Sequence, residues 1–155
     1  MKRPKVLCVD DDAGFRSYYQ TLLTEYGYDV TVAQSGAQAL ELLDSDPNFE
    51  AVISDYEMPR MNGAELAAVL KHNYPGLPFI MVSASQPVLE DAEHFVDAAL
   101  PKGSSAEDLV TQLDTLLAAQ RHPQALRQTA SRYAPLGTAL ATVAGAVLLL
   151  LKSGK

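Results

Sequence analysis

Short apolar runs alternate with segments of helical periodicity along residues 1–120 of the chain. The apolar runs have the length of buried strands and lie at residues 5–9, 28–33, 51–53, 77–82 and 98–100. The segments between them repeat apolar residues at the spacing of an amphipathic helix, near residues 15–26, 39–43, 64–72, 87–95 and 109–117. Five strand–helix repeats predict an α/β fold, a doubly wound parallel sheet of five strands with helices on both faces.

The strands themselves support a parallel sheet. Their apolar residues run continuously instead of alternating with polar ones, which is typical of strands buried on both faces. In open sheets of this class, ligands bind beyond the carboxyl ends of the strands, near the point where the strand order reverses. Candidate chemistry is therefore expected where the predicted strands end.

Three tyrosines of the first predicted helix, Tyr18, Tyr19 and Tyr26, fall among apolar residues at helical spacing. This spacing is typical of a helix face that packs on a core. We therefore expect all three side chains to serve packing.

Charge is distributed unevenly along the chain, whose net charge is −7. All 19 acidic residues lie at or before Asp114, whereas five of the 12 basic residues follow it, so the two parts carry −12 and +5. An acidic body disfavours binding to nucleic acid, and a basic tail suits an anionic membrane surface. The lone cysteine, Cys8, has no disulfide partner, which favours a reducing, cytoplasmic setting.

Polar residues stand at four of the predicted strand ends: the acidic run 10–12, Asp55, Ser83 and Lys102. A single Asp after a strand is usually a turn former. Several carboxylates at one edge would repel each other, however, and a hard cation such as Mg²⁺ would relieve the repulsion. A hydroxyl and an ammonium group suit the oxygens of a phosphoryl group. Together these residue types predict a phosphoryl-transfer pocket with magnesium.

Three sequence motifs around these residues are similar to those of a known protein family. Residues 6–12 (VLCVDDD), 51–63 (AVISDYEMPRMNG) and 80–84 (IMVSA) precede Lys102 in the chain. In order and spacing, from about residue 5 to residue 117, they resemble the receiver domains of response regulators in two-component signal transduction. The resemblance implies a flavodoxin-like strand order, 2-1-3-4-5.

The resemblance also implies a role for each position. Asp55 would accept a phosphoryl group from a phosphohistidine of a sensor histidine kinase or a histidine phosphotransfer protein. The other implied positions are Asp10, Asp11 and the backbone carbonyl of Glu57 as ligands of Mg²⁺ beside Asp55, and Ser83 and Lys102 as binders of the phosphoryl oxygens. Such a protein is a phosphorylation-dependent switch of a two-component or phosphorelay system rather than an enzyme.

The sequence departs from the family pattern around the lysine and the phosphoacceptor. Ala99 stands three positions before Lys102, where family members carry an aromatic residue that takes part in the switch. Gly103 follows the lysine, where Pro is common, and Glu57 occupies a position that tunes the lifetime of the phosphoryl group in the family. A second interpretation is therefore a membrane-tethered interaction module whose receiver fold no longer switches.

A third reading is a phosphatase similar to the haloacid dehalogenases. The run of residues 10–12 contains an Asp-x-Asp pattern, and this class also uses a Ser or Thr and a Lys, with Asp10 as nucleophile. It needs further acidic metal ligands on a strand end after the lysine. The acidic residues after Lys102 all fall on a predicted helix, and the Asp55 loop would have no role.

The tail differs from the body in composition. Residues 121–134 are predicted to form a basic linker and residues 135–151 a hydrophobic helix that crosses the membrane. The uncharged run from residue 136 to residue 151 would be roughly 24 Å long as a helix, slightly short of an average bilayer core. Packing on a partner protein is the alternative. Small residues at Gly137, Ala141 and Gly145 suit a homodimer contact, with the receiver in the cytoplasm and the tail in the inner membrane.

Overall fold

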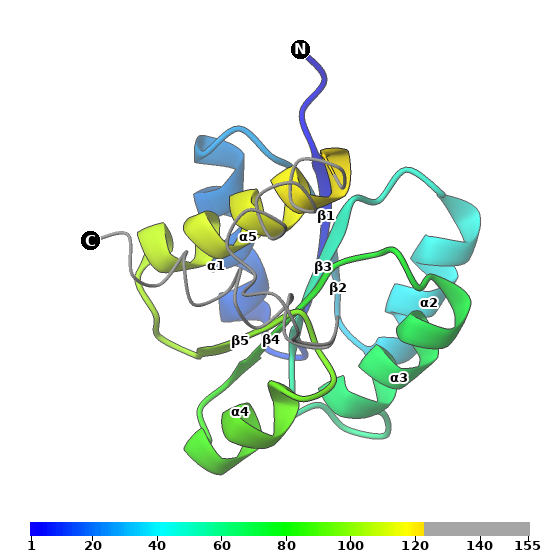
Figure 1. The fold of residues 1–155 in the computed structure, drawn as a ribbon. Helices are drawn as coiled ribbons and strands as arrows, with labels where there is room; N and C mark the ends of the chain where they lie inside the picture. The colour runs from blue at the N-terminus through cyan, green and yellow to red at the C-terminus, as the bar shows by residue number, and fades with distance from the viewer. Residues whose placement is uncertain (123–155) are drawn as a thin grey trace, which may run out of the picture. The chain divides into compact units, whose positions relative to one another are not determined.

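The computed structural model of the protein describes residues 1–122, in which five strands alternate with five helices (Figure 1). The strands are β1 (Lys5–Val9), β2 (Asp29–Ala33), β3 (Ala51–Asp55), β4 (Phe79–Ser83) and β5 (Ala98–Pro101). The helices are α1 (Ala13–Glu25), α2 (Gly36–Ser45), α3 (Gly63–Asn73), α4 (Gln86–Ala92) and α5 (Ala106–Arg121). The predicted alternation is confirmed, although α4 ends earlier than the sequence pattern indicates.

All strand pairs are parallel, and the sheet order is β2-β1-β3-β4-β5, as the resemblance implied. The register aligns the carboxyl ends of neighbouring strands. Val9 of β1 pairs with Ser54 of β3, and Ser83 of β4 pairs with Pro101 of β5. Consequently, the residues that end β1, β3, β4 and β5 meet at one edge of the sheet.

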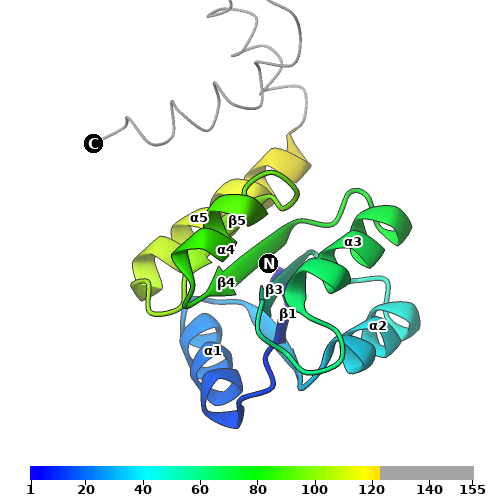
Figure 2. The ribbon, with the colours of Figure 1, turned by 90° about the horizontal axis from the view of Figure 1, so that it is seen from below.

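Helices cover both faces of this sheet, with α1 and α5 on one side and α2 and α3 on the other (Figure 2). Each face has its own buried cluster. On the α1 and α5 side, Leu23 and Leu113 pack against inward residues such as Ile53. On the opposite side, Leu66 and Phe79 belong to a cluster that also contains residues of α2 and α4. Burial on both faces explains why the strands read as continuous apolar runs.

The expectation for the three tyrosines of the first predicted helix is confirmed for Tyr19 and wrong for Tyr18 and for Tyr26, which follows the last residue of α1. Tyr19 is 5% exposed and packs in the cluster beneath α1, whereas Tyr18 and Tyr26 are each 47% exposed. The face of α1 that contacts the sheet follows the spacing from Tyr19 to Leu23, its two buried residues. The apolar face of the helix is wider than the part that touches the sheet. Aromatic residues at the edge of this face therefore remain partly exposed to solvent.

The predictions for the tail concern residues that lie almost entirely beyond the described part of the chain. The linker 121–134 is described only at residues 121 and 122, and the predicted membrane helix 135–151 lies outside, together with Gly137, Ala141 and Gly145. Within residues 1–122, no helix combines the length and apolarity that a membrane crossing requires.

The loop between β3 and α3 lies close against the end of β3. The Gly63 amide donates to the Tyr56 carbonyl at 2.8 Å, and α3 begins with a reciprocal pair of hydrogen bonds between Asn62 and Glu65. A Cβ atom on Gly63 would lie 2.4 Å from the Asp55 carbonyl oxygen. Glycine is therefore required at this position to hold the loop beside Asp55.

We expect Gly63→Ala to lower the free energy of unfolding by about 1–3 kcal/mol, because the added methyl group forces backbone or core atoms apart. Urea titration followed by circular dichroism measures this change. Gly76→Ala is the matched control, since a Cβ atom there meets nothing within 4 Å. Equal stability of the two variants would contradict the close approach at Gly63.

Candidate functional site

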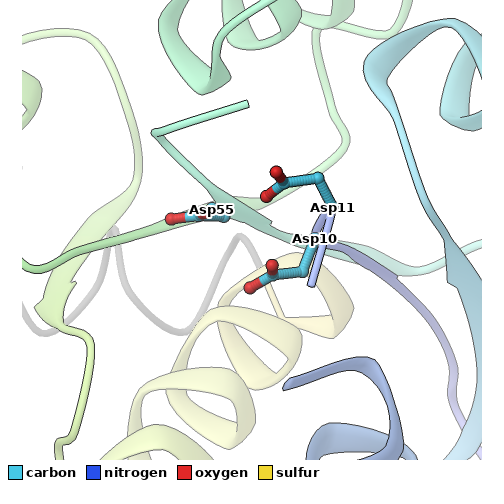
Figure 3. A group of neighbouring side chains, drawn as sticks. All are labelled: Asp10, Asp11 and Asp55. Carbon is cyan, nitrogen blue, oxygen red and sulfur yellow. The ribbon is translucent and has the colours of Figure 1, made fainter. Parts of the chain in front are cut away.

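Three carboxylates meet at the carboxyl edge of the sheet. Asp10 and Asp11 follow β1, Asp55 is the last residue of β3, and Figure 3 shows their side chains in one region. One carboxylate oxygen from each of the three lies within 4.8 Å of the others. Asp10 and Asp55 are buried, at 0% and 1% exposure, whereas Asp11 is exposed. The predicted acidic ligands are therefore together, and two of them are removed from water.

Lys102 supplies a positive charge to the buried pair. Its amide donates to the Ser83 carbonyl at 2.8 Å, which ties the residue after β5 to the end of β4. Its ammonium donates a hydrogen bond to Asp55 Oδ2 at 3.0 Å. It also lies 3.0 Å from Asp10 Oδ2, as an ion pair without the angles of a hydrogen bond. The Lys102 side chain is 12% exposed, so the pairing takes place largely out of water.

The pKa values of this group reflect burial opposed by pairing. Burial raises the pKa of Asp55, with the hydrogen bond from Lys102 acting against it and the charge of Asp10 adding to it. For Lys102, burial lowers the pKa, but the hydrogen bond to Asp55 and the negative charges of Asp55 and Asp10 outweigh that effect and raise it overall. The ammonium is thus held in its charged form, while Asp55 carries an incompletely compensated negative charge.

Two buried carboxylate oxygens remain without a hydrogen bond. They are Asp10 Oδ2 and Asp55 Oδ1, whereas Asp10 Oδ1 accepts from the Asp12 amide at 2.9 Å. Opposite oxygen ligands of one magnesium ion lie about 4.2 Å apart, twice its usual bond length, which is close to the spread of these three groups. The donor set of hard, anionic oxygens therefore fits Mg²⁺.

Ser83 lies at the predicted place, but its hydroxyl is bonded elsewhere. Ser83 is fully buried at the end of β4, and its Oγ accepts from the Ser85 amide at 3.0 Å. The hydroxyl has its other contact with Glu57 Oε1, at 3.5 Å. Among the hydrogen bonds of residues 1–122, none joins Ser83 to Asp55. The proposed roles of the Ser83 hydroxyl and of the Glu57 backbone carbonyl remain predictions.

The two departures near the lysine have visible structural consequences. Ala99 is half-buried in β5, pairs with Met81 and packs against the cluster on the α3 side of the sheet. Gly103 adopts a φ of 129°, which proline cannot reach because its ring holds φ near about −65°. The loop that carries Lys102 thus follows a path that requires glycine.

Two residues of α1 with no predicted role contact the site. The Lys102 ammonium lies 4.0 Å from the centroid of the Phe15 ring, and Arg16 donates to the backbone carbonyls of Asp10 and Asp11. Asp12 caps α1 by accepting from the Phe15 amide at 3.0 Å, so the helix that carries both residues begins directly after the acidic run. A basic residue near the start of a helix, where the helix dipole disfavours it, is the sequence signal that could have identified Arg16.

Comparisons with known proteins agree with this arrangement. The family profile described as response regulator receiver domain matches residues 6–114. The response regulator MprA of Mycolicibacterium vanbaalenii is 34% identical over 116 residues, which cover 73% of this chain and 50% of MprA. The chain thus spans about half the length of this relative.

Solved structures share the fold. A receiver domain protein from Clostridium thermocellum superposes with a TM-score of 0.72 at 20% identity, covering 78% of this chain and 99% of that one, which shows the fold alone. TrrA of Thermotoga maritima, solved in complex with Mg(2+)-BeF, gives a TM-score of 0.69 at 27% identity over 73% of this chain and 98% of TrrA.

Without metal, we expect Asp55→Asn to raise the free energy of unfolding at pH 7 by about 1 kcal/mol, because it removes a buried charge beside Asp10. The raised pKa of Asp55 means that folding favours its protonated form. The free energy of unfolding of the wild type therefore falls as the pH rises from 3.8, the ordinary pKa of Asp, through the pKa of Asp55 in the folded protein. The asparagine of the variant does not titrate, so the variant shows no such fall. Urea titrations in chelator across this pH range measure the difference.

Asp46→Asn is the matched control, because a hydrogen bond from Lys5 lowers the pKa of Asp46. This variant should not gain stability as the pH rises. An Asp55→Asn protein no more stable than the wild type at neutral pH would contradict the electrostatic description of the site.

Proposed function

The chain belongs to the response regulator receiver domain family, and we propose that it is a phosphorylation-dependent switch that accepts a phosphoryl group on Asp55. One observation carries the proposal: a buried carboxylate with an unpartnered oxygen, held by Lys102 beside a second buried carboxylate. An acceptor needs such an oxygen, whose lone pairs are not engaged in a hydrogen bond, and a nearby positive charge. The phosphodonor is a phosphohistidine of a sensor kinase or of a histidine phosphotransfer protein.

The chemistry is a transfer between two side chains. An Asp55 oxygen attacks phosphorus, the new O–P bond forms, and the N–P bond of the donor imidazole breaks. The electron pair stays on the imidazole nitrogen, which takes a proton from solvent. Lys102, already 3.0 Å from Asp55 Oδ2, pairs with the phosphoryl oxygens as their charge accumulates at the acceptor.

Magnesium fits the same edge, held by Asp10, Asp11 and Asp55 together with the Glu57 carbonyl. When bound, it supplies positive charge that offsets the phosphoryl oxygens and the carboxylates. The chain's own contribution is to place three carboxylate oxygens within 4.8 Å of one another.

The switch event assigned to Ser83 is an exchange of hydrogen-bond partner. Its hydroxyl leaves Glu57, a contact of 3.5 Å, and donates to a phosphoryl oxygen. Such a local electrostatic change biases the surrounding loop. With Ala99 in place of an aromatic residue, the output does not pass through a ring at that position. The complete acidic, hydroxyl and lysine set favours this switch over an interaction module that has lost phosphorylation.

A phosphatase that uses Asp10 is less well supported. It would need acidic ligands from a strand end after Lys102. In the described part of the chain, Asp114 lies on α5 and accepts a hydrogen bond from Tyr28, and Glu107 and Asp108 occupy the first turn of α5. We therefore propose a signalling switch rather than an enzyme that hydrolyses a phosphorylated substrate.

Membrane tethering belongs to the proposal on sequence grounds. The uncharged run at residues 136–151 follows a stretch that carries Arg121, Arg127 and Arg132. Basic residues on the cytoplasmic side would place the receiver in the cytoplasm, at the inner membrane. Gly137, Ala141 and Gly145 would allow two such helices to pack closely as a homodimer.

We expect wild-type protein to gain the mass of one phosphoryl group when phosphoramidate and Mg²⁺ are supplied, and Asp55→Asn to gain none. The substitution keeps the size of the side chain but removes the nucleophilic charge. Intact-mass spectrometry measures the gain, and chelation of magnesium should suppress it. Asp46→Asn is the control and should be labelled like the wild type.

The wild type and Asp55→Asn, together with Asp10→Asn, separate the alternative functions. If Asp55→Asn hydrolyses a phosphomonoester and Asp10→Asn does not, the phosphatase reading is correct. If the wild type is not labelled despite a folded spectrum, the chain is an interaction module that has lost acceptor chemistry.

We expect the full-length chain to remain in the membrane pellet after carbonate extraction and to be released by detergent. Val143→Arg should shift it to the supernatant, because arginine near the centre of a membrane helix costs about 2.5–3.5 kcal/mol. Thr142→Ser is the control. Recovery of wild-type protein in the soluble fraction without detergent would contradict tethering.

A further inference from the structure

Arg16 makes two hydrogen bonds to the backbone that carries the acidic pair. Its Nη1 donates to the carbonyl oxygen of Asp10 at 2.8 Å and to that of Asp11 at 2.9 Å. Both bonds come from a charged donor and are as short as charge-assisted hydrogen bonds usually are. They connect α1 to the turn that follows β1.

The position of Arg16 in α1 does not stabilise the helix itself. Arg16 is the fourth residue of α1, near the positive end of the helix dipole, where a cation is disfavoured. The helix start is already satisfied by Asp12, whose side chain accepts from the Phe15 amide. An arginine folded back across its own helix start therefore has its favourable contacts on the turn, at the two carbonyls.

Arg16 contacts the backbone carbonyls of Asp10 and Asp11 and leaves their carboxylates free of its guanidinium. Lys102 approaches the carboxylate oxygens of Asp10 and Asp55, where it competes with any other cation. Arg16 instead contacts the carbonyl oxygens of the two successive peptide units that follow Asp10 and Asp11, and so restrains the backbone from which both side chains leave. Its charge offsets part of the local negative charge while the carboxylate oxygens stay available to a metal.

We propose that Arg16 is a positioning residue, which holds the main chain of Asp10 and Asp11 so that their carboxylates converge with Asp55 on one divalent cation. This role rests on the proposed function, in which that edge binds Mg²⁺. Two effects of Arg16 oppose each other. Its positive charge repels the ion, which weakens binding. Its two hydrogen bonds to the carbonyls hold the ligands in place, which strengthens binding, and this second effect is the larger.

The sign of one measurement separates these effects. Arg16→Gln removes the charge and the two-carbonyl contact, and the Mg²⁺ dissociation constant should rise about tenfold, the size usual for residues that orient metal ligands. Arg16→Lys keeps the charge but loses the planar guanidinium, and its affinity should fall between those of Arg16→Gln and the wild type. If repulsion were the main effect, Arg16→Gln would bind Mg²⁺ more tightly.

The experiment is calorimetric titration of MgCl₂ into the full-length chain and its variants in detergent, with unfolding by urea measured in chelator. Arg60→Gln is the matched control: it removes the same charge from an exposed residue on the loop after β3, and its affinity should stay within twofold of the wild type. Affinity changes that follow the metal-free stability across all variants would indicate a merely structural role and overturn the inference.

The outcomes for the two proposals are distinct. If the wild type shows no Mg²⁺ binding, the proposed function fails. If the wild type binds and Arg16→Gln binds equally well or more tightly, the proposed function stands and the role of Arg16 is wrong. Should Arg16→Gln not fold, Arg16→Lys decides, since affinity equal to that of the wild type would overturn the inference.

Discussion

At the carboxyl edge of the sheet, the Lys102 ammonium lies 3.0 Å from each of two buried carboxylates, Asp10 and Asp55. Parallel pairing makes this crowding unavoidable, because adjacent strands are about 4.8 Å apart and β1 and β3 end in register. Burying two like charges costs several kcal/mol unless they are paired. One lysine offsets part of this cost, and the remaining negative charge makes the edge suitable for a divalent cation and for phosphoryl chemistry.

The core and the loops hold the carboxyl edge of the sheet in place although its clustered carboxylates repel one another. Two apolar clusters, one on each face, hold the sheet rigid beneath the site. The loop after β3 is pressed against the strand at Gly63, and the loop after β5 depends on the backbone of Gly103. Stability is thus concentrated in the core and lowered at the edge, a distribution typical of functional sites.

Much of this arrangement follows from sequence pattern, because it depends on periodicity and on where strands end. Asp55 and Lys102 could be assigned to one edge before any coordinates, since parallel strands bring their carboxyl ends together. The orientation of Ser83 toward Glu57 could not, because a hydroxyl rotamer depends on neighbouring loops. Tyr18 was misjudged because helical spacing identifies an apolar sector but not which part of it contacts the sheet. A basic residue near the start of a helix marks Arg16 as unusual, but its two carbonyl contacts depend on the geometry of the turn after β1, which sequence pattern does not give.

The order of the site residues along the chain has a consequence for biosynthesis. Asp10 and Asp55 leave the ribosome early, whereas Lys102 comes after β5, the last strand of the sheet. Until β5 pairs with β4, a growing chain holds two acidic strand ends without the ammonium that offsets them. The counter-ion is therefore delivered by the same event that completes the sheet. Assembly of the acceptor site therefore waits until all five strands have been synthesised.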